Sequence, residues 1–590
     1  MNVLIKSINY LKKETSVVLF FVVLISSWAA HISFRNEHFQ EGDSSGTYTV
    51  MYDFPAATLR TTALIYPAGN FLSLDQAQSI LKDPRVQAVR NKYLSSFSDE
   101  FLLNQLTKSS AIATFRYGLI QAVSILHLPF PIQSFFATGL GSTYSSGVGF
   151  IYGLIGGKNG TYADFMSHTM IISITLFHMA ILLLFLINRK LGVRTYINVA
   201  ISTVALFSIS LYSSGIHIGS TVWNFTTELF WIWYLIKNIN SPKLLRKMSW
   251  CSGILVFFNY LILFFWLSFI VTLLIEKVKK ERQANPNSTN LRKVLGYSWE
   301  IVKQQKGAIM LIGLCGILFF QPGQGFRGAV HLIDLPANIY YIVLNFFSWY
   351  THSTLFDIFQ FIFGVLFIAS GVFFLINRKC SESSRELWLA RQIFICLIFT
   401  YIFLVCVQTL SFTPTRHILF LFPIIFITAG IGLEFLIRKI NSQISKSIQI
   451  IFLASLSLLG FCMIKIRQED SYDRTREIQI DKDVAMIGIY DSSYNIYYEN
   501  LHSGVPVTFI NPKTFKVGET YLYVSQSDPL EVAYKEWQVT YDIEIEKIWE
   551  KSDITEAYFV AHNPDFKNSR YSRPNNFYQT KFKVISIKQK

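Results

Sequence analysis

Charged residues are scarce in this chain. Only 15% of its 590 residues are Asp, Glu, Lys or Arg, whereas 51% are hydrophobic. Soluble globular domains carry about 25% charged residues, so this composition excludes an ordinary soluble protein. Apolar runs of about 20 residues, the length that a helix needs to cross a bilayer, recur along most of the chain. The composition therefore indicates a protein that crosses a membrane many times.

Cysteine is also scarce. All six cysteines lie in or beside apolar runs, and the long polar segments contain none. We therefore expect no structural disulfide and no thiolate metal site. The sequence also lacks a Walker loop, a dinucleotide fingerprint, a zinc-ligand pattern and a serine-triad motif. No internal repeat is evident, which disfavours a transporter built from inverted repeats.

The basic residues are distributed in a way that indicates membrane topology. The formal net charge is +15, but these residues fall largely in short loops between apolar runs, as the positive-inside rule describes. We therefore expect no nucleic-acid partner. The basic N-terminus and the apolar run after it resemble a signal peptide with a cleavage site near Ala29, but a run of about 17 residues favours an uncleaved anchor.

Oriented by this rule, the apolar runs predict a polytopic α-helical membrane protein with about 11–13 transmembrane helices. The expected spans are residues 16–34, 110–127, 132–156, 167–187, 194–213, 217–236, 307–320, 354–376, 391–411, 418–437 and 447–465. The run 251–275 has basic residues at both ends, so it predicts a bent or re-entrant pair of short helices that turns near Asn259-Tyr260.

Two domains follow from this pattern. Residues 1–465 form the transmembrane domain, with long outer loops over 35–108 and 321–352. Residues 466–590 differ in kind, because β-rich runs at 484–490, 507–510, 520–524 and 582–587 are broken by Gly, Pro and Asn. They predict a small soluble α/β domain. The charge rule puts this domain on the same outer face as the loop 35–108.

An acidic cluster follows the first span directly. Glu37, Glu41, Asp43 and Asp53 lie within the first residues of the outer loop. A carboxylate at a membrane surface can remove a proton from an acceptor hydroxyl, and Asp43, between Gly42 and Ser44, is our candidate for that base. With Glu37 or Glu41 it could also hold a divalent cation through oxygen ligands. The alternative is a solvated acidic loop without a role.

Two outer arginines are candidates for binding a phosphate. Arg416 lies in the turn TPTRH just before the span 418–437, where a guanidinium can grip a lipid-linked phosphate bidentately or act as a snorkelling anchor. Arg327 lies, with His331 and Asp334, in a glycine-rich outer loop that either orders over a bound lipid substrate or simply connects two spans. His417 is more simply an interfacial histidine.

Further ionisable residues lie inside or beside the spans. Arg116 and Glu228 lie within apolar runs, and ionisable groups in hydrocarbon are expensive enough to indicate a function or a buried partner. Asp164, in the short loop before the span 167–187, is a second acid on the outer face. Its alternative role is that of a carboxylate at a helix N-terminus.

The arrangement resembles the GT-C superfamily of membrane glycosyltransferases. These enzymes have a first span, a long outer loop with an acidic motif, a series of further spans and often an outer C-terminal domain. The residues Glu-Gly-Asp at 41–43 lie where the family's catalytic acid occurs. The segment TRHILFLFPIIF, which starts at Thr415, is similar to the family's arginine-containing entry to a late span.

The resemblance implies a transfer reaction. A sugar would move, with inversion, from a polyprenyl-phosphate donor to a lipid, glycan or protein acceptor on the extracytoplasmic face. Asp43 would act as general base, and Arg416, Arg327 and Arg116 would bind the donor phosphate. Many members have paired acids, whereas Asp43 is followed by two serines.

That difference leaves the cofactor and the second acid open. Glu41, Asp53 and Asp164 are the candidates for the second acid, and a divalent cation, Mg²⁺ or Mn²⁺, is an alternative to metal-free catalysis. We expect a multi-pass protein of a bacterial inner membrane with its C-terminal domain outside. Two other classes stay open: a transporter or flippase of lipid-linked sugars, and a polysaccharide polymerase or ligase.

Overall fold

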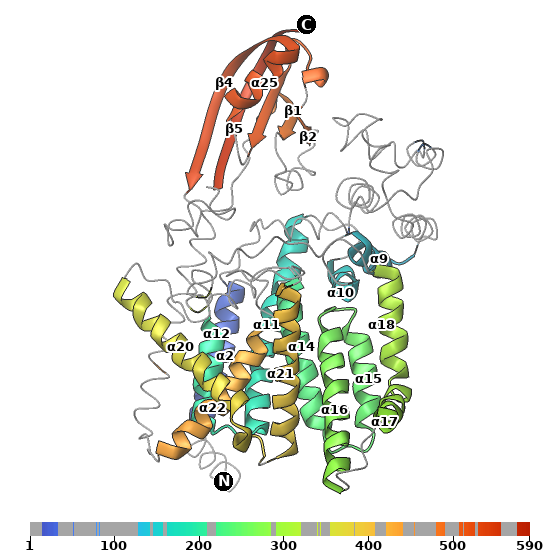
Figure 1. The fold of residues 1–590 in the computed structure, drawn as a ribbon. Helices are drawn as coiled ribbons and strands as arrows, with labels where there is room; N and C mark the ends of the chain where they lie inside the picture. The colour runs from blue at the N-terminus through green and yellow to red at the C-terminus, as the bar shows by residue number, and fades with distance from the viewer. Residues whose placement is uncertain are drawn as a thin grey trace, which may run out of the picture. The chain divides into compact units, whose positions relative to one another are not determined.

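The structure is a computed structural model that is mostly helical and carries a small C-terminal sheet (Figure 1). It describes residues 15–33, 128–141, 146–156, 162–208, 220–284, 291–319, 354–382, 384–406, 421–440, 480–489, 507–510, 512–525, 529–555 and 575–590, with the single positions 51, 78, 82, 339, 343, 454 and 505.

The chain divides into two compact units. The first comprises Met1–Glu37, Thr143–Ile151 and Ser167–Asp470, and we call it the helical unit. The second comprises His38–Ser142, Tyr152–Met166 and Ser471–Lys590. The domain boundary expected between residues 465 and 466 stays a prediction.

Apolar helices make up the described part of the helical unit. They are α2 (Thr15–Ser33), α11 (Tyr162–Lys190, which begins in the second unit), α12 (Thr195–Phe207), α14 (Ser220–Asn238), α15 (Leu244–Leu255), α16 (Ile262–Ala284), α17 (Leu291–Lys303), α18 (Lys306–Phe319), α20 (Thr354–Ile376), α21 (Arg385–Cys406) and α22 (Phe422–Ile440). Two shorter helices, α9 (Phe130–Gly141) and α10 (Ser146–Gly156), precede α11.

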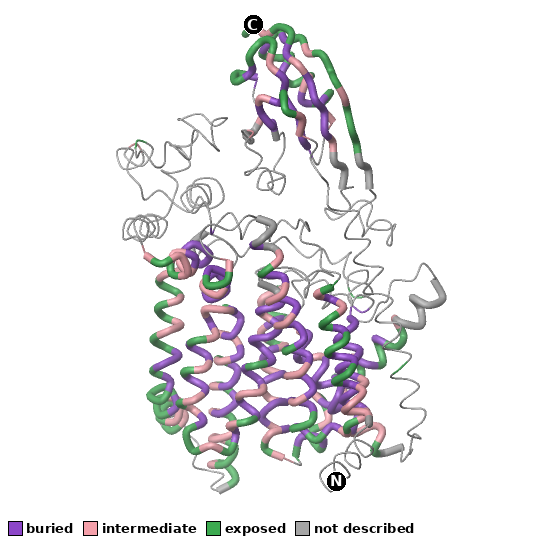
Figure 2. The backbone as a smooth tube through the Cα atoms, turned by 180° about the vertical axis from the view of Figure 1, so that it is seen from behind, coloured by how far each residue is buried: buried purple, intermediate pink, exposed green. Residues whose placement is uncertain are grey.

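Three of the described helices are long and apolar enough to cross a membrane. They contain residues 16–33, 167–190 and 385–406, and a fourth candidate is the pair α17 and α18, which is bent by 75° at its break. Exposed positions recur along the described helices (Figure 2), and large apolar side chains such as Ile25 (62% exposed) and Phe399 (69% exposed) are among them. Only 28% of the span 16–33 and 39% of the span 385–406 are buried, and apolar surface exposed to this extent indicates an apolar solvent. These helices indicate a membrane protein.

The directions of the helices follow from contacts between them. The rings of Phe20 and Phe185 stack with centroids 4.8 Å apart, and Trp28 Nε1 donates a hydrogen bond to Thr175 Oγ1 at 3.1 Å. Because the residue numbers run in opposite senses, α2 and α11 are antiparallel. The carboxyl end of α2 therefore lies beside the amino-terminal half of α11.

Helix α22 runs in the same direction as α11. Arg194, at the start of α12, donates from Nε to Glu434 Oε1 at 2.9 Å and from its backbone nitrogen to Glu434 Oε2 at 2.9 Å. Since Arg194 follows the end of α11 closely, the last turns of α22 lie at the end of the unit where α11 finishes. Phe422, the first residue of α22, therefore lies at the opposite end, as does Ser33.

The described lysines and arginines of the helical unit gather at the end where α11 and α22 finish, which we call the basic end. They include Arg189, Lys190, Arg194, Lys237, Lys243, Arg246, Lys247, Lys277, Lys279, Lys280, Arg282, Lys293, Lys303, Lys306, Arg378, Lys379, Arg385, Arg391 and Arg438. At the opposite, non-basic end, the described residues of this unit include no lysine or arginine.

The expected turn near Asn259-Tyr260 is present. Helices α15 and α16 are separated by residues 256–261, and the hairpin that they form has its open end toward the basic end (Figure 1). Asn259 is buried, and its Oδ1 accepts a hydrogen bond from the Leu261 backbone nitrogen at 2.9 Å. The hairpin is asymmetric, because α15 has 12 residues and α16 has 23.

One expected span has a different structure. The sequence predicts a single helix over residues 132–156, whereas the structure has two, α9 and α10, of 12 and 11 residues. The prediction is wrong because the Gly- and Ser-rich segment 139–149 interrupts the apolar run, and both residue types weaken a helix. The expected spans 110–127 and 447–465 lie outside the described residues.

The C-terminal sheet confirms the β-rich runs of the tail. It contains β1 (Val484–Ile489), β2 (Val507–Phe509), β3 (Thr520–Ser525), β4 (Tyr541–Thr555) and β5 (Asn575–Gln589), in the order β2-β1-β3-β5-β4. Strand β1 is parallel to β2 and β3, whereas β5 is antiparallel to β3 and β4. Helix α25 (Leu530–Thr540) precedes β4.

Aromatic side chains fill the core between α25 and the sheet. The Phe582 ring lies 5.7 Å from Phe515, 5.8 Å from Tyr521 and 6.0 Å from Trp537, measured between centroids. All four side chains are buried. Each large ring buries about 150–250 Å², so this cluster contributes hydrophobic stabilisation to the packing of α25 on the sheet.

A buried lysine makes the stability of the sheet depend on pH. Lys581, only 7% exposed, donates hydrogen bonds to Asp481 and Asp483, each at 2.7 Å. The bond from Lys581 lowers the pKa of Asp483 below its ordinary value of 3.8. A lowered carboxyl pKa stabilises the fold above the ordinary pKa, and this contribution is lost as pH falls through the lowered value.

We therefore expect hydrogen exchange of β1, β3 and β5 in the full-length protein to accelerate as pH is lowered below the ordinary Asp pKa. Intrinsic exchange rates must be divided out at each pH. Lys581→Met should reduce this pH dependence, because it removes the group that favours the ionised carboxylates. An unchanged pH dependence in the variant would show that the three residues do not set it.

Candidate functional site

Most predicted site residues lie outside the described part of the chain. These are Glu37, Glu41, Asp43, Arg116, Arg327 and Arg416. Asp164 is different, because its backbone belongs to the first turn of α11. The helices next to several of these residues in the sequence are described.

The helix that precedes the acidic segment ends at the non-basic end of the helical unit. Helix α2 ends at Ser33, and Glu37, Glu41 and Asp43 follow within ten residues. The three carboxylates themselves lie outside the described residues.

Two predicted phosphate-binding arginines lie close in sequence to helix termini at the same end. Arg416 precedes Phe422, the start of α22, by six residues, and Arg327 follows Phe319, the end of α18, by eight. Helix α18 starts at the basic end and finishes at the non-basic end (Figure 1). Both arginines themselves lie outside the described residues.

Two buried histidines lie beside the end of α2, and the sequence analysis missed them. Ser27 Oγ lies 3.2 Å from His31 Nδ1 and 3.2 Å from His178 Nε2. The two imidazole centroids are 5.1 Å apart. Two sequence signals were available: Ser27 and His31 share one face of α2, and His178 interrupts the apolar run of α11.

These histidines join α2 to α11 just before the chain leaves the membrane helix. Each ring also contacts a backbone carbonyl on its own helix, at Ser27 for His31 and at Ile174 for His178, both at 2.7 Å. A buried imidazole can act as donor and acceptor at once, so it can bridge two helices. The arrangement fixes the helix end from which the acidic segment departs.

Glu228 forms a buried hydrogen bond with a residue of another element, as expected of a structural role. Its Oε1 accepts a hydrogen bond from Asn259 Nδ2 at 3.1 Å, and its side chain is fully buried. The same Asn259 nitrogen lies 3.3 Å from the Asn224 carbonyl oxygen. Asn259 thus joins α14 to the turn between α15 and α16. This geometry favours the structural reading of Glu228.

A double-mutant cycle tests that reading. Asn259→Leu leaves a buried carboxyl group without its donor, which typically costs about 1–3 kcal/mol, so we expect a lower unfolding temperature. Glu228→Leu removes the other partner. Because the two residues are in contact, the double variant should lose less than the sum of the single losses. Additive losses in detergent-solubilised protein would show that the pair is not coupled.

A second buried acid, Glu434, links two helices at the basic end. Glu434 Oε1 accepts hydrogen bonds from Arg194 Nε at 2.9 Å and from Arg438 Nε at 2.6 Å. The Glu434 side chain is buried, whereas both arginines reach solvent. This carboxylate joins α12 to α22 at the basic end, so it holds the two helices together.

Among the described residues, no group of three or more His, Cys, Asp or Glu could hold a metal ion. The predicted cation ligands Glu37, Glu41 and Asp43 are not among them. Compared with known proteins, the chain matches no family model and none of the curated proteins.

Proposed function

We propose that this protein is a multi-pass membrane glycosyltransferase that uses a polyprenyl-phosphate-linked sugar and has Asp43 as its general base. The observation that carries the proposal is that the described helix termini next in sequence to the acidic segment, Arg327 and Arg416 (Ser33, Phe319 and Phe422) all lie at one end of the helical unit, opposite the basic end. The GT-C resemblance supplies the reaction class.

The distribution of basic residues supports the proposed topology. Lysine and arginine are retained on the cytoplasmic side of membrane helices, so the basic end faces the cytoplasm and the acidic segment faces the opposite side. An outward span over 447–465 then puts the C-terminal sheet on the extracytoplasmic face. For a bacterial protein, the membrane is the inner membrane.

The proposed reaction is a single displacement. Asp43 removes the proton of an acceptor hydroxyl while the hydroxyl oxygen bonds to the anomeric carbon of the sugar. The bond between that carbon and the donor phosphate oxygen breaks, and the electron pair leaves with the polyprenyl phosphate. One displacement inverts the configuration of the anomeric carbon.

Arginines stabilise the leaving phosphate in this mechanism. Arg416 presents a planar guanidinium that can bind two phosphate oxygens at once, with Arg327 and Arg116 as further candidates. Glu41, Glu37 and Asp164 are candidates for orienting the acceptor or for holding Mg²⁺ or Mn²⁺ beside Asp43. A lipid, a glycan or a protein serves as acceptor.

Transfer by membranes that contain the protein tests the proposal. Radiolabelled polyprenyl-phosphate sugars are supplied, and both labelled product and released polyprenyl phosphate are measured against membranes that lack the protein. We expect one donor to give stoichiometric transfer and a product of inverted anomeric configuration. Movement of the intact lipid-linked sugar across vesicles, undiminished in Asp43→Ala, would instead identify a flippase. Activity that survives Asp43→Asn but not Arg327→Ala would identify a polymerase or ligase.

A further inference from the structure

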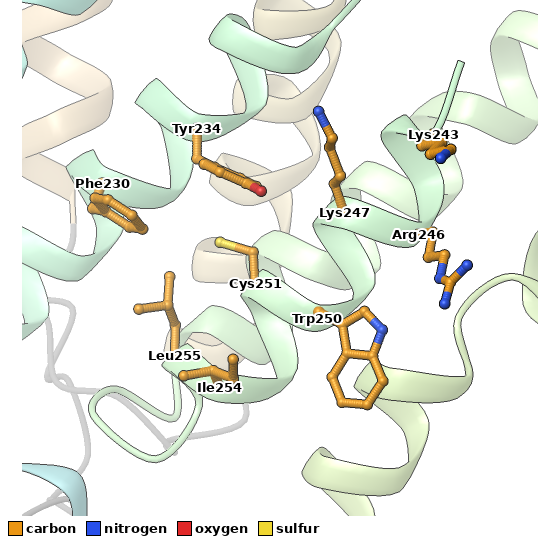
Figure 3. Close-up of a pocket in the computed structure, with 9 residues that line it drawn as sticks. All are labelled: Phe230, Tyr234, Lys243, Arg246, Lys247, Trp250, Cys251, Ile254 and Leu255. Atoms are coloured by element: carbon orange, nitrogen blue, oxygen red, sulfur yellow. The ribbon is translucent and has the colours of Figure 1, made fainter. Parts of the chain in front are cut away.

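A cavity between α14 and α15 lies in the half of the helical unit that carries the basic end. Its volume is about 540 Å³, within the range of small-molecule sites. Nine residues line it: Phe230, Tyr234, Lys243, Arg246, Lys247, Trp250, Cys251, Ile254 and Leu255. Figure 3 shows the three cationic side chains toward one end and Phe230, Ile254 and Leu255 toward the other. The cavity is therefore amphiphilic along its length.

The cations come from one stripe of α15. Lys243, Arg246 and Lys247 lie at the start of the helix, and Trp250 and Ile254 continue the same face one and two turns later. The opposite face, which includes Met248 and Ser252, is buried. This exposed stripe changes from charged to apolar toward the interior of the unit.

These cations have no carboxylate partner within the described residues. Lys247 Nζ donates to the neutral Asn238 Oδ1 at 2.7 Å, and neither Lys243 nor Arg246 has a side-chain ion pair there. None of the nine lining residues is acidic. The three positive charges at this end of the cavity therefore favour the binding of an anion.

The apolar end of the cavity favours an alkyl chain. Trp250 is 44% exposed and Ile254 is 52% exposed, and both belong to the lining of the cavity. From Lys243 to Leu255 the helix rises about 18 Å, similar to the roughly 15 Å depth of one leaflet's hydrocarbon. A ligand with a phosphate head and a chain of that length matches the whole cavity.

We infer that this cavity binds an anionic phospholipid of the leaflet at the basic end, with its phosphate beside Lys243, Arg246 and Lys247 and an acyl chain along Phe230, Ile254 and Leu255. Basic sites between membrane helices on the cytoplasmic side recognise anionic head groups in this way. The inference rests on the membrane disposition proposed above and is independent of the transfer reaction.

Lipid binding to the purified full-length protein tests the inference. After delipidation, phosphatidylglycerol and phosphatidylcholine with identical acyl chains are titrated separately, and the lipids retained are counted by native mass spectrometry. We expect wild type to retain phosphatidylglycerol preferentially. The triple variant Lys243→Gln, Arg246→Gln, Lys247→Gln should weaken the tightest binding by roughly 100-fold, because each charge near an anionic lipid contributes about 1 kcal/mol.

The control removes the same charge elsewhere on the basic end. Arg189, Lys190 and Lys379 are exposed and do not line the cavity, so the matching triple glutamine variant should bind like wild type. Ile254→Gln should weaken lipid binding but leave the preference for phosphatidylglycerol. Each variant must first elute as a single species with an unfolding temperature near that of wild type, and single substitutions replace any triple variant that does not.

Three outcomes would overturn the inference. The first is equal retention of both lipids by wild type. The second is undiminished phosphatidylglycerol binding by the cavity triple variant. The third is displacement of the lipid by millimolar inorganic phosphate, because a free phosphate would then be the ligand.

Discussion

Asp43→Asn is expected to lower the turnover number for sugar transfer by about 10²–10⁴-fold, the range in which a positioned general base accelerates proton transfer. Asparagine has nearly the same size as aspartate but cannot accept the acceptor's proton. Donor binding depends on the phosphate and the lipid, so the Michaelis constant for the donor should change little. This separation is characteristic of a group that acts only in the transition state.

Asp83→Asn provides the matched control for this variant. Asp83 belongs to the same outer segment but lies outside the acidic cluster at 37–53. Its replacement changes the net charge of the segment equally and should leave turnover within a small factor of wild type. Equal losses in the two variants would indicate that the charge of the segment matters, and not the carboxylate of Asp43.

Arg416→Ala is expected to raise the Michaelis constant for the polyprenyl-phosphate donor and to lower turnover. A charge-assisted hydrogen bond contributes about 1.5–3 kcal/mol, so the combined loss in kcat/KM should be about 10- to 150-fold. Arg416→Lys should recover only part of this loss, because an ammonium group keeps the charge but cannot bind two phosphate oxygens in a planar fork.

A snorkelling anchor would behave differently from a phosphate ligand. If Arg416 only positions α22 in the membrane, lysine should replace it fully, because both side chains place their charge at the interface. Full activity in Arg416→Lys, or an unchanged donor constant in Arg416→Ala, would therefore remove Arg416 from the donor site. Lys379→Gln, at the basic end, is the control for a general effect of lost charge.

The helices were predictable because long apolar runs constrain the chain strongly. Helix α20 occupies residues 354–376, the same bounds that the sequence predicts. Helix α17 was missed because LRKVLGYSWEIVK mixes charged and apolar residues and contains no apolar run. One face of this helix is at least half-buried, because Val294 and Ser298 are intermediate and Ile301 is 5% exposed, whereas Leu295 and Trp299 on the other face are each 60% exposed.

In the tail, strand β4 was not predicted from the sequence, again because charged residues break up its apolar pattern. Strand β4 pairs only with β5 in the described sheet, and its sequence YDIEIEKIWEKSDIT is rich in charge. A strand at the edge of a sheet keeps one polar face and carries charges that hinder further pairing. The alternation is present, because Ile543 is buried while Asp542 and Glu544 are exposed.

The described polar contacts could not be predicted, because they depend on how distant helices pack. His31 and His178 are far apart in the chain and meet only because α2 and α11 are antiparallel. Glu228 attracts attention from sequence alone, but its partner Asn259 is supplied by the turn between α15 and α16. An unusual residue in an apolar run thus signals a buried contact without identifying it.

The most direct test of the proposed function is sugar transfer from radiolabelled polyprenyl-phosphate donors in membranes that contain equal amounts of wild type, Asp43→Asn or Asp83→Asn. We expect transfer by wild type and Asp83→Asn and near-complete loss in Asp43→Asn, which would establish both the enzyme class and its base. Equal transfer by all three proteins would contradict the assignment of Asp43. Absence of transfer by wild type with every donor would contradict the proposed glycosyltransferase.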